Sequence, residues 1–239
     1  MTASTPDRRD AATHVEIPLA LRDVTLCRGG RTLVSNLSLE VRAGDLIALR
    51  GPSGCGKTTI LRAIAGLDPF ASGTIRVGDA RLEGGTIPDR ATVHRLRRSV
   101  GLVFQFHCLF EHMSALQNVC LAPVHVHGTP HHAAEQAGRD LLRQLGVEPR
   151  ADAWPRELSG GEAQRVAIAR ALAVNPPVLL MDEPMASLDS SRRAELGALL
   201  QRLTESGRTL LVTTHDERFA EEYATRILTI EGGVVRDVV

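Results

Sequence analysis

The stretch GPSGCGKTT at residues 51–59 constrains the fold of this chain more than any other feature. It fits the pattern G-x-x-x-x-G-K-[ST], follows the apolar run LIALR at 46–50 and precedes the helical pattern TTILRAIAGL at 58–67. A strand that turns through such a loop into a helix places backbone N–H groups around phosphate oxygens. The sequence therefore predicts a nucleotide-binding α/β protein whose phosphate loop contains Gly51, Pro52, Ser53, Gly54, Cys55, Gly56, Lys57, Thr58 and Thr59.

Two of these side chains and a second strand supply the expected chemistry. The Lys57 ammonium can reach the outer phosphates, and the Thr58 hydroxyl can bind Mg²⁺. The run VLLMDE at 178–183 indicates a buried strand that ends in Asp182 and Glu183. One carboxylate, Asp182, can serve the magnesium shell, while Glu183 can orient and deprotonate water. Acids that end a strand are often only solvated charges, but the phosphate loop upstream favours the catalytic interpretation.

Further strand patterns place the phosphate loop in a larger sheet. Alternation at 37–41 and apolar runs at 178–181, 209–214 and 226–230 predict strands, and helical patterns such as 191–203 separate them. Alternating strands and helices are typical of a mainly parallel sheet with helices on its faces. We therefore expect the α/β fold of a P-loop nucleoside triphosphatase.

The middle of the chain differs from this pattern, because strand signals fade between about 106 and 173. Apolar residues recur there at helical spacing and predict an α-helical subdomain inserted into the α/β core. The segment 1–18 mixes charges with Ser, Thr and Pro, so we expect a mobile N-terminal tail followed by one ATPase domain at 19–239. The positions at helical spacing are Ala134, Ala137, Leu141, Leu142 and Leu145.

Composition excludes several classes of function. The chain has 28 Lys plus Arg and 28 Asp plus Glu, so no net positive field favours nucleic acid, and we expect no nucleic-acid partner. No window approaches 18 consecutive apolar residues, so we expect no membrane span. The four cysteines lack paired spacing and a secretory context, which predicts free thiols in a reducing cytosol.

A second candidate phosphate cradle lies at 157–173, in ELSGGEAQRVAIARALA. Ser159, Gly160 and Gly161 would open a helix there, with a hydroxyl beside free N–H groups. This stretch, between the phosphate loop and the Asp-Glu strand, resembles the signature motif of ABC-type ATPases. The resemblance runs from about Leu19 to Gly232. It also covers Gln105 (Q-loop), Ser187-Leu188-Asp189 (D-loop) and His215 (switch histidine).

The resemblance implies a role for each of these positions in an ATPase that uses ATP and Mg²⁺. Gln105 would lie at the magnesium and the attacking water, and His215 would bond the γ-phosphate and hold the water of Glu183 in line. Asp189 would shape the interface of a head-to-tail dimer. The signature residues 159–161 would then contact the γ-phosphate of ATP held by the partner copy.

Two positions depart from the family pattern. The family usually stacks an aromatic residue on adenine, and here that position falls at or near Arg28, in TLCRGGR. A guanidinium plane can stack on a base, so Arg28 is our candidate adenine contact. Met185 follows DEP where Thr is usual, which we interpret as a tolerated change in packing.

The stretch VGLVFQFHCLFEHMSALQNVCLAPVHVHG, residues 100–128, looks most like the ATP-binding subunits of polar amino-acid importers. FQFHCL together with LSGGE also resembles ATPases of lipoprotein release and peptide export, so import is favoured over export without being settled. Soluble ABC ATPases of translation or DNA repair are less favoured, because the chain has one cassette and no long insertion. A free P-loop kinase would leave LSGGE without a role.

The resemblance also implies partners and a location. We expect a dimer on the cytoplasmic face of the membrane, bound to transmembrane permease subunits, with an extracytoplasmic substrate-binding protein as a further partner of an importer. The candidate docking surface is 106–113, with Leu109 and Phe110. The alternative is that these apolar residues form the core of the helical subdomain.

Overall fold

The computed structural model describes residues 16–186 and 188–238. Residues 1–15 of the predicted mobile tail at 1–18 lie outside these ranges. Ser187 of the D-loop motif also lies outside them. Within the described ranges, no helix combines the length and the apolar character needed to cross a membrane.

A six-stranded sheet forms the centre of the fold. Strands β6, β7, β8, β3 and β9 run parallel to one another in this order, and β10 pairs antiparallel with β9 at the edge. This is the mainly parallel sheet that the sequence predicted. The strands are β3 (Leu46–Arg50), β6 (Val100–Val103), β7 (Val178–Asp182), β8 (Thr209–Thr213), β9 (Arg226–Glu231) and β10 (Val234–Asp237).

A second sheet has four antiparallel strands. The sequence predicted only one segment of it, residues 37–41, which forms the end of β2. The strand order is β2-β1-β4-β5, and buried and exposed residues alternate along β5 and the end of β2 because one face packs on the core. The strands are β1 (Leu19–Arg28), β2 (Arg31–Val41), β4 (Ser72–Val77) and β5 (Ala80–Glu83).

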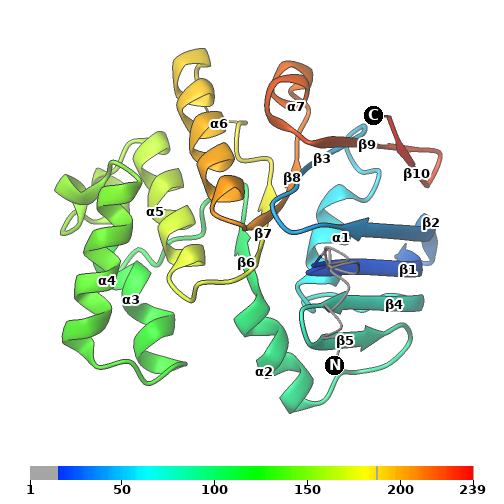
Figure 1. Ribbon diagram of the computed structural model, residues 1–239, viewed down its shortest axis with the longest axis horizontal. Helices are drawn as coiled ribbons and strands as arrows, with labels where there is room; N and C mark the ends of the chain where they lie inside the picture. Colours follow the sequence, from blue (N-terminus) through cyan, green and yellow to red (C-terminus); the bar gives the residue numbers. More distant parts are fainter. Residues whose placement is uncertain (1–15, 187, 239) are drawn as a thin grey trace, which may run out of the picture.

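The helices divide between two sides of the central sheet. Figure 1 shows α3, α4 and α5 gathered on one side of the molecule, while the four-stranded sheet and α1 lie on the other. The helices are α1 (Lys57–Ile64), α2 (Arg90–Ser99), α3 (Ala115–His125), α4 (His131–Gln144), α5 (Gly160–Leu172), α6 (Ser190–Glu205) and α7 (Glu217–Tyr223). Two 3-10 helices, η1 (Glu148–Arg150) and η2 (Pro155–Glu157), connect α4 to α5.

Strand β7 separates two hydrophobic cores because successive side chains of a strand point to opposite faces. Val178 and Leu180 join the core that β7 shares with α1 and the four-stranded sheet. Leu179 and Met181 join the core that includes α3, α4, α5 and α6. With both faces covered, every residue of β7 is buried, and the carboxyl end of the strand is fixed where the candidate site begins.

Glycine 101 in β6 lets α5 approach the sheet closely. A Cβ atom there would lie 2.8 Å from the carbonyl oxygen of Ala171 and 2.9 Å from Leu179 Cδ1. Since Cβ atoms do not tolerate such distances, only glycine permits this packing of the α5 carboxyl end on β6. The signature helix therefore lies directly beside the strand that leads to Gln105.

Candidate nucleotide-binding site

The phosphate loop joins β3 to α1 through backbone conformations that favour glycine. Gly51 has φ +151° and Gly56 has φ +115°. A Cβ atom at Gly51 would lie 2.8 Å from Cys55 Sγ, and one at Gly56 would lie 3.2 Å from Val34 Cγ2. Helix α1 begins at Lys57 with no side-chain cap and no acidic residue in its first turn. Its free N–H groups and the positive end of its dipole therefore suit an anion.

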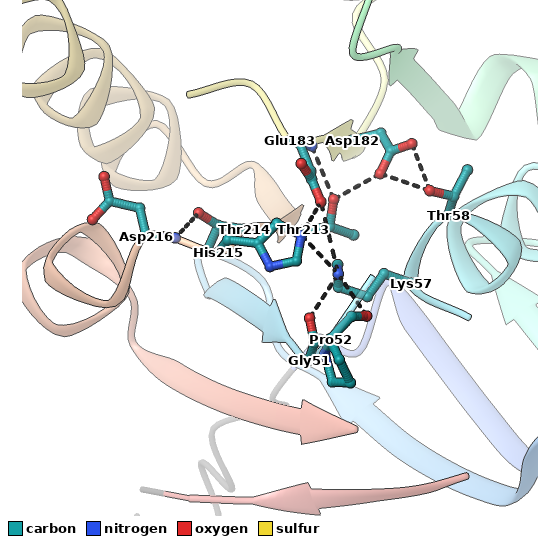
Figure 2. A network of polar contacts seen from close by, with 10 residues as sticks. All are labelled: Gly51, Pro52, Lys57, Thr58, Asp182, Glu183, Thr213, Thr214, His215 and Asp216. Atoms are coloured by element: carbon teal, nitrogen blue, oxygen red, sulfur yellow. Dashed lines mark hydrogen bonds and ion pairs between the residues drawn. The ribbon is translucent and has the colours of Figure 1, made fainter. Parts of the chain in front are cut away.

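Lys57 lies buried at the centre of the site, with only 5% of its surface exposed. Its Nζ donates hydrogen bonds to the carbonyl oxygens of Gly51 (2.8 Å) and Pro52 (3.3 Å). The same ammonium lies 3.7 Å from Glu183 Oε1. Figure 2 shows the two side chains close together in the site. A cation held among loop carbonyls and one carboxylate can contact a phosphate without moving far.

Thr58, Asp182 and Thr213 form a chain of hydrogen bonds across the ends of α1, β7 and β8 (Figure 2). The Thr58 hydroxyl donates to both carboxylate oxygens of Asp182, at 3.1 and 2.8 Å. Thr213 Oγ1 donates to Asp182 Oδ1 at 2.7 Å. Asp182 is buried, so these donors offset the loss of solvent around its charge. A hydroxyl next to a carboxylate is a set of hard oxygen donors of the kind that Mg²⁺ prefers.

Glu183 follows β7 in a left-handed conformation, with φ +48°. For a residue other than glycine this conformation costs on the order of 1 kcal/mol or more. It is held because the Glu183 N–H donates to Thr213 Oγ1 at 2.9 Å and contacts the Thr213 carbonyl at 3.2 Å. The turn brings the carboxylate toward Lys57 and His215 instead of letting it continue along the strand.

His215 completes this cluster from the loop after β8. Its Nε2 lies 2.7 Å from Glu183 Oε1 and 3.2 Å from Lys57 Nζ. The short contact with Glu183 requires one proton, carried either by Nε2 or by the carboxyl group. An Nε2–H on His215 would donate a hydrogen bond to Glu183 beside the buried Lys57 ammonium.

The sequence interpretation missed the residues that position His215. Asp216 caps α7 by accepting from the Phe219 N–H at 3.0 Å, and it accepts from Arg193 Nη1 at 3.0 Å. Arg193 also donates to the Leu188 carbonyl at 2.8 Å, beside Asp189, which caps α6. A cavity of about 400 Å³ lies along these groups and includes Glu183 in its lining.

The signature residues form a helix N-terminus of their own. The Ser159 hydroxyl accepts from the Glu162 N–H at 3.3 Å, and the Glu162 carboxylate accepts from the Ser159 N–H at 2.7 Å. That backbone hydrogen bond lowers the pKa of Glu162. A Cβ atom at Gly160 would meet nothing within 4 Å, so this end of α5 faces open space. Over the described ranges, no hydrogen bond or ion pair joins residues 159–161 to the phosphate loop of the same chain.

Two other predicted site residues also stand apart from the Lys57 cluster. Arg28 ends β1 in an exposed position. Hydrogen bonds from Arg62 lower the pKa of Asp68, and the charge of Arg28 adds to this effect, so Arg28 lies near Asp68. Gln105 follows β6 and is half-buried. Within residues 16–186 and 188–238, neither side chain forms a hydrogen bond or an ion pair with the phosphate loop.

Comparisons with known proteins agree with this geometry. Residues 34–186 match the family model described as ABC transporter. The glutamine transport ATP-binding protein GlnQ of Escherichia coli K12 is 38% identical over 92% of this chain and 90% of its own length. The L-cystine transport system ATP-binding protein TcyN of the same organism is 40% identical over 85% of this chain and 82% of its own. The arginine transport ATP-binding protein ArtM of Bacillus subtilis 168 is 39% identical, covering 87% and 85%.

A solved structure gives the same result for the fold. The dimeric ATP-binding cassette MJ0796, in a post-hydrolysis state bound to ADP and phosphate, superimposes with a TM-score of 0.81 and 32% identity. The match covers 92% of this chain and 97% of that one. Together, the phosphate loop, the Asp182–Glu183 strand and these matches define a P-loop ATPase. The chain belongs to the ABC transporter family, in which it is an ATP-binding and ATP-hydrolysing subunit.

Proposed function

We propose that this chain powers the import of polar amino acids by hydrolysing ATP on the cytoplasmic face of a membrane. The arrangement of Lys57, Glu183 and His215 beside the Thr58–Asp182 pair is the observation that carries the hydrolytic part. Support for the substrate class comes from the relatives, whose names assign them to glutamine, cystine and arginine transport.

In the proposed reaction, Glu183 accepts a proton from water while the water oxygen bonds to the γ-phosphorus of ATP. The bond from that phosphorus to the bridging oxygen breaks, and ADP leaves with the electron pair. His215, which is 2.7 Å from Glu183, orients the carboxylate and bonds the γ-phosphate. Lys57 offsets the negative charge that develops on the phosphate oxygens, and Gln105 holds the attacking water.

We assign the magnesium site to Thr58 and Asp182, with Gln105 as a further ligand. Mg²⁺ supplies charge neutralisation to the phosphates when it is bound. The hydroxyl and carboxylate oxygens already lie within 2.8 Å of each other, which matches the preference of the ion for oxygen donors. Thr213 keeps the Asp182 carboxylate in place by donating to its second oxygen.

We further propose that two copies of the chain share their nucleotides head to tail. Ser159 and Gly160 are exposed, Gly160 faces open space, and over the described ranges residues 159–161 form no hydrogen bond with their own phosphate loop, so they suit the γ-phosphate of ATP on a partner copy. Asp189, which caps the neighbouring helix α6, would lie at that interface. The similar cassette MJ0796 is dimeric, which supports this arrangement.

The permease would bind the segment from Phe106 to Met113. Phe106 is 83% exposed and Phe110 is 43% exposed, whereas Leu109 packs on the helical core. A largely apolar groove of about 320 Å³ adjoins the segment, with His112 and Met113 in its lining. An extracytoplasmic binding protein would deliver the substrate to the permease.

Purification of the native complex tests this function. The complex should contain permease subunits and, in lipid vesicles, should hydrolyse ATP faster when a binding protein loaded with glutamine, arginine or cystine is present. The Lys57→Ala complex should neither hydrolyse ATP nor take up amino acid. ATP hydrolysis that drives peptide or lipoprotein export instead would overturn the import proposal, while leaving the ATPase site intact.

A further inference from the structure

The chain bends sharply just after Gln105, at two residues that are not glycine. His107 has φ +60° and Cys108 has φ +49°, so two successive residues adopt the left-handed conformation. Side chains with a Cβ atom rarely take this conformation, and a consecutive pair needs support from its surroundings. We call residues 105–108 the link, because it joins β6 and Gln105 to the exposed Phe110.

Arg170 of the signature helix supplies that support. Its Nη2 donates to the His107 carbonyl at 2.9 Å, and its Nη1 donates to the Cys108 carbonyl at 2.6 Å. The guanidinium also lies 6.0 Å from the centre of the Phe110 ring. Burial lowers the pKa of Arg170, yet an arginine stays protonated in proteins, so the charged fork is available to both carbonyls.

Two sets of hydrogen bonds hold the backbone after Gln105. Within the turn, the His107 N–H donates to the Phe104 carbonyl at 3.1 Å and the Cys108 N–H donates to the Phe106 carbonyl at 2.6 Å, while Arg170 ties the two left-handed residues to α5. The position of Gln105 therefore depends on both sets of bonds. No hydrogen bond of its side chain is described for the residues that the structure covers. On one side it is held by β6, where Val103 pairs with Met181 of β7. On the other side the chain enters the left-handed pair. The backbone is therefore held on both sides of Gln105, by β6 before it and by the bonded link after it, and Arg170 fastens that link to α5.

We propose that Arg170 is a positioning residue for ATP hydrolysis, which acts by fixing the link and thereby the place of Gln105. The inference rests on the role proposed above for Gln105 in holding the attacking water. It also connects the two ends of α5: one end carries the signature residues 159–161, and the other end holds the link and Phe110. Arg170 thus bonds the segment proposed for docking to the signature helix.

Arg165 provides a matched control on the same helix. It donates to the Leu145 carbonyl at 3.1 Å and pairs with Glu195, and neither partner touches the link. Lysine at either position keeps the charge and most of the stem, but it loses the planar fork that binds two acceptors. The paired variants Arg170→Lys and Arg165→Lys therefore separate support of the link from general packing of α5.

The test is a double-mutant cycle, with ATP hydrolysis by the full complex as the readout. Arg170→Lys should lower kcat roughly fivefold and change KM for ATP less than about twofold, because the phosphate loop is untouched. Adding Arg170→Lys to Gln105→Ala should cause no further loss, since residues that act as a unit are not additive. Arg165→Lys should leave kcat within about twofold of the natural chain. Cys108→Gly, which adopts φ > 0 freely, should recover part of the kcat that Arg170→Lys loses.

Three results would overturn the proposal. If Gln105→Ala lowers kcat and the double variant loses the product of the two single losses, then Arg170 does not act through Gln105. The role of Gln105 would still stand. Equal losses in the Arg165 and Arg170 variants would show only a packing effect. An unimpaired Gln105→Ala complex would remove the proposed role of Gln105 and the inference with it. Should Arg170→Lys fail to fold, Arg170→Gln, which keeps one donor group, takes its place in the same cycle.

Discussion

The site has two ends that are held in different ways. At the ends of β7 and β8, side chains bond one another: Thr58 and Thr213 both donate to Asp182, and Glu183 contacts Lys57 and His215. At the end of β6, the Gln105 side chain has no such bond among the described residues, and an arginine from a different helix holds the neighbouring backbone. The first end belongs to the central sheet and the second is tied to the signature helix.

This difference suggests different roles for the two ends: the Asp182–Glu183 end carries the catalytic groups, and the Gln105 end connects the site to α5. Buried groups that bond one another keep their geometry whatever the rest of the chain does, which suits the proposed binding of phosphate and magnesium. The backbone link is instead tied to α5, because its carbonyls accept from Arg170. We infer that a permease acting on Phe110 would change the second end of the site and leave the first unchanged.

The largest expected effect concerns Glu183, at the first end. Glu183→Gln removes the proposed base and should lower hydrolysis by a factor of roughly 10² or more, while ATP binding is kept. Rapid-quench hydrolysis and filter binding of ATP measure the two quantities. Glu217→Gln is the control, because Glu217 is exposed and pairs with Arg50 outside the cluster. Hydrolysis that survives in Glu183→Gln would assign the base to another residue.

A smaller effect is expected when the first end loses one internal bond. Thr213→Val removes a donor to Asp182 and an acceptor of the Glu183 N–H, so the free energy of unfolding should fall by roughly 1–3 kcal/mol. Denaturant titration should show a lower midpoint at unchanged slope.

Thr209→Val is the matched control for this change. Thr209 is equally buried at the opposite end of β8, where its hydroxyl makes one bond to the Arg42 carbonyl. It should lower stability less and leave hydrolysis unchanged. Equal losses of both properties in the two variants would remove the special place given to Thr213.

The smallest effect concerns Arg28, the proposed adenine contact, which lies outside both ends. Arg28→Ala should weaken ATP binding by about 1 kcal/mol, which is a modest cation–π contribution, and Arg28→Tyr should restore it. Calorimetric titration with ATP measures the change. Arg31→Ala, at the paired position on β2, is the control. Identical affinities in all these variants would leave Arg28 as a surface charge near Asp68.

The sequence was sufficient for the first end because its residues lie in local motifs. The apolar run before Asp182 requires a buried strand, and the pattern at 51–59 requires a phosphate loop, so the neighbourhood of Thr58, Asp182 and Glu183 could be predicted. Thr213 could not be singled out, because a threonine in a strand carries no signal until its partner is known.

The second end could not be predicted for a related reason. Arg170 lies 62 positions from Cys108, and an arginine on a helix normally indicates a solvated surface. The residue types of His107 and Cys108 do not predict a left-handed conformation, because tertiary contacts impose it. Most of the four-stranded antiparallel sheet also escaped prediction, although β1 and β2 have 10 and 11 residues. Register shifts interrupt the pairing of β1 with β2, so buried and exposed residues do not alternate regularly along β1.

The most direct test of the account is whether two defective chains complete each other. Lys57→Ala removes the phosphate lysine, and Ser159→Arg puts a bulky side chain where a small hydroxyl should approach the γ-phosphate. Each variant alone spoils both sites of its own dimer. When the two are co-assembled with their membrane subunits, one site combines an intact phosphate loop with an intact signature. We therefore predict one occluded ATP per mixed dimer. No occluded ATP after mixing would contradict the shared site.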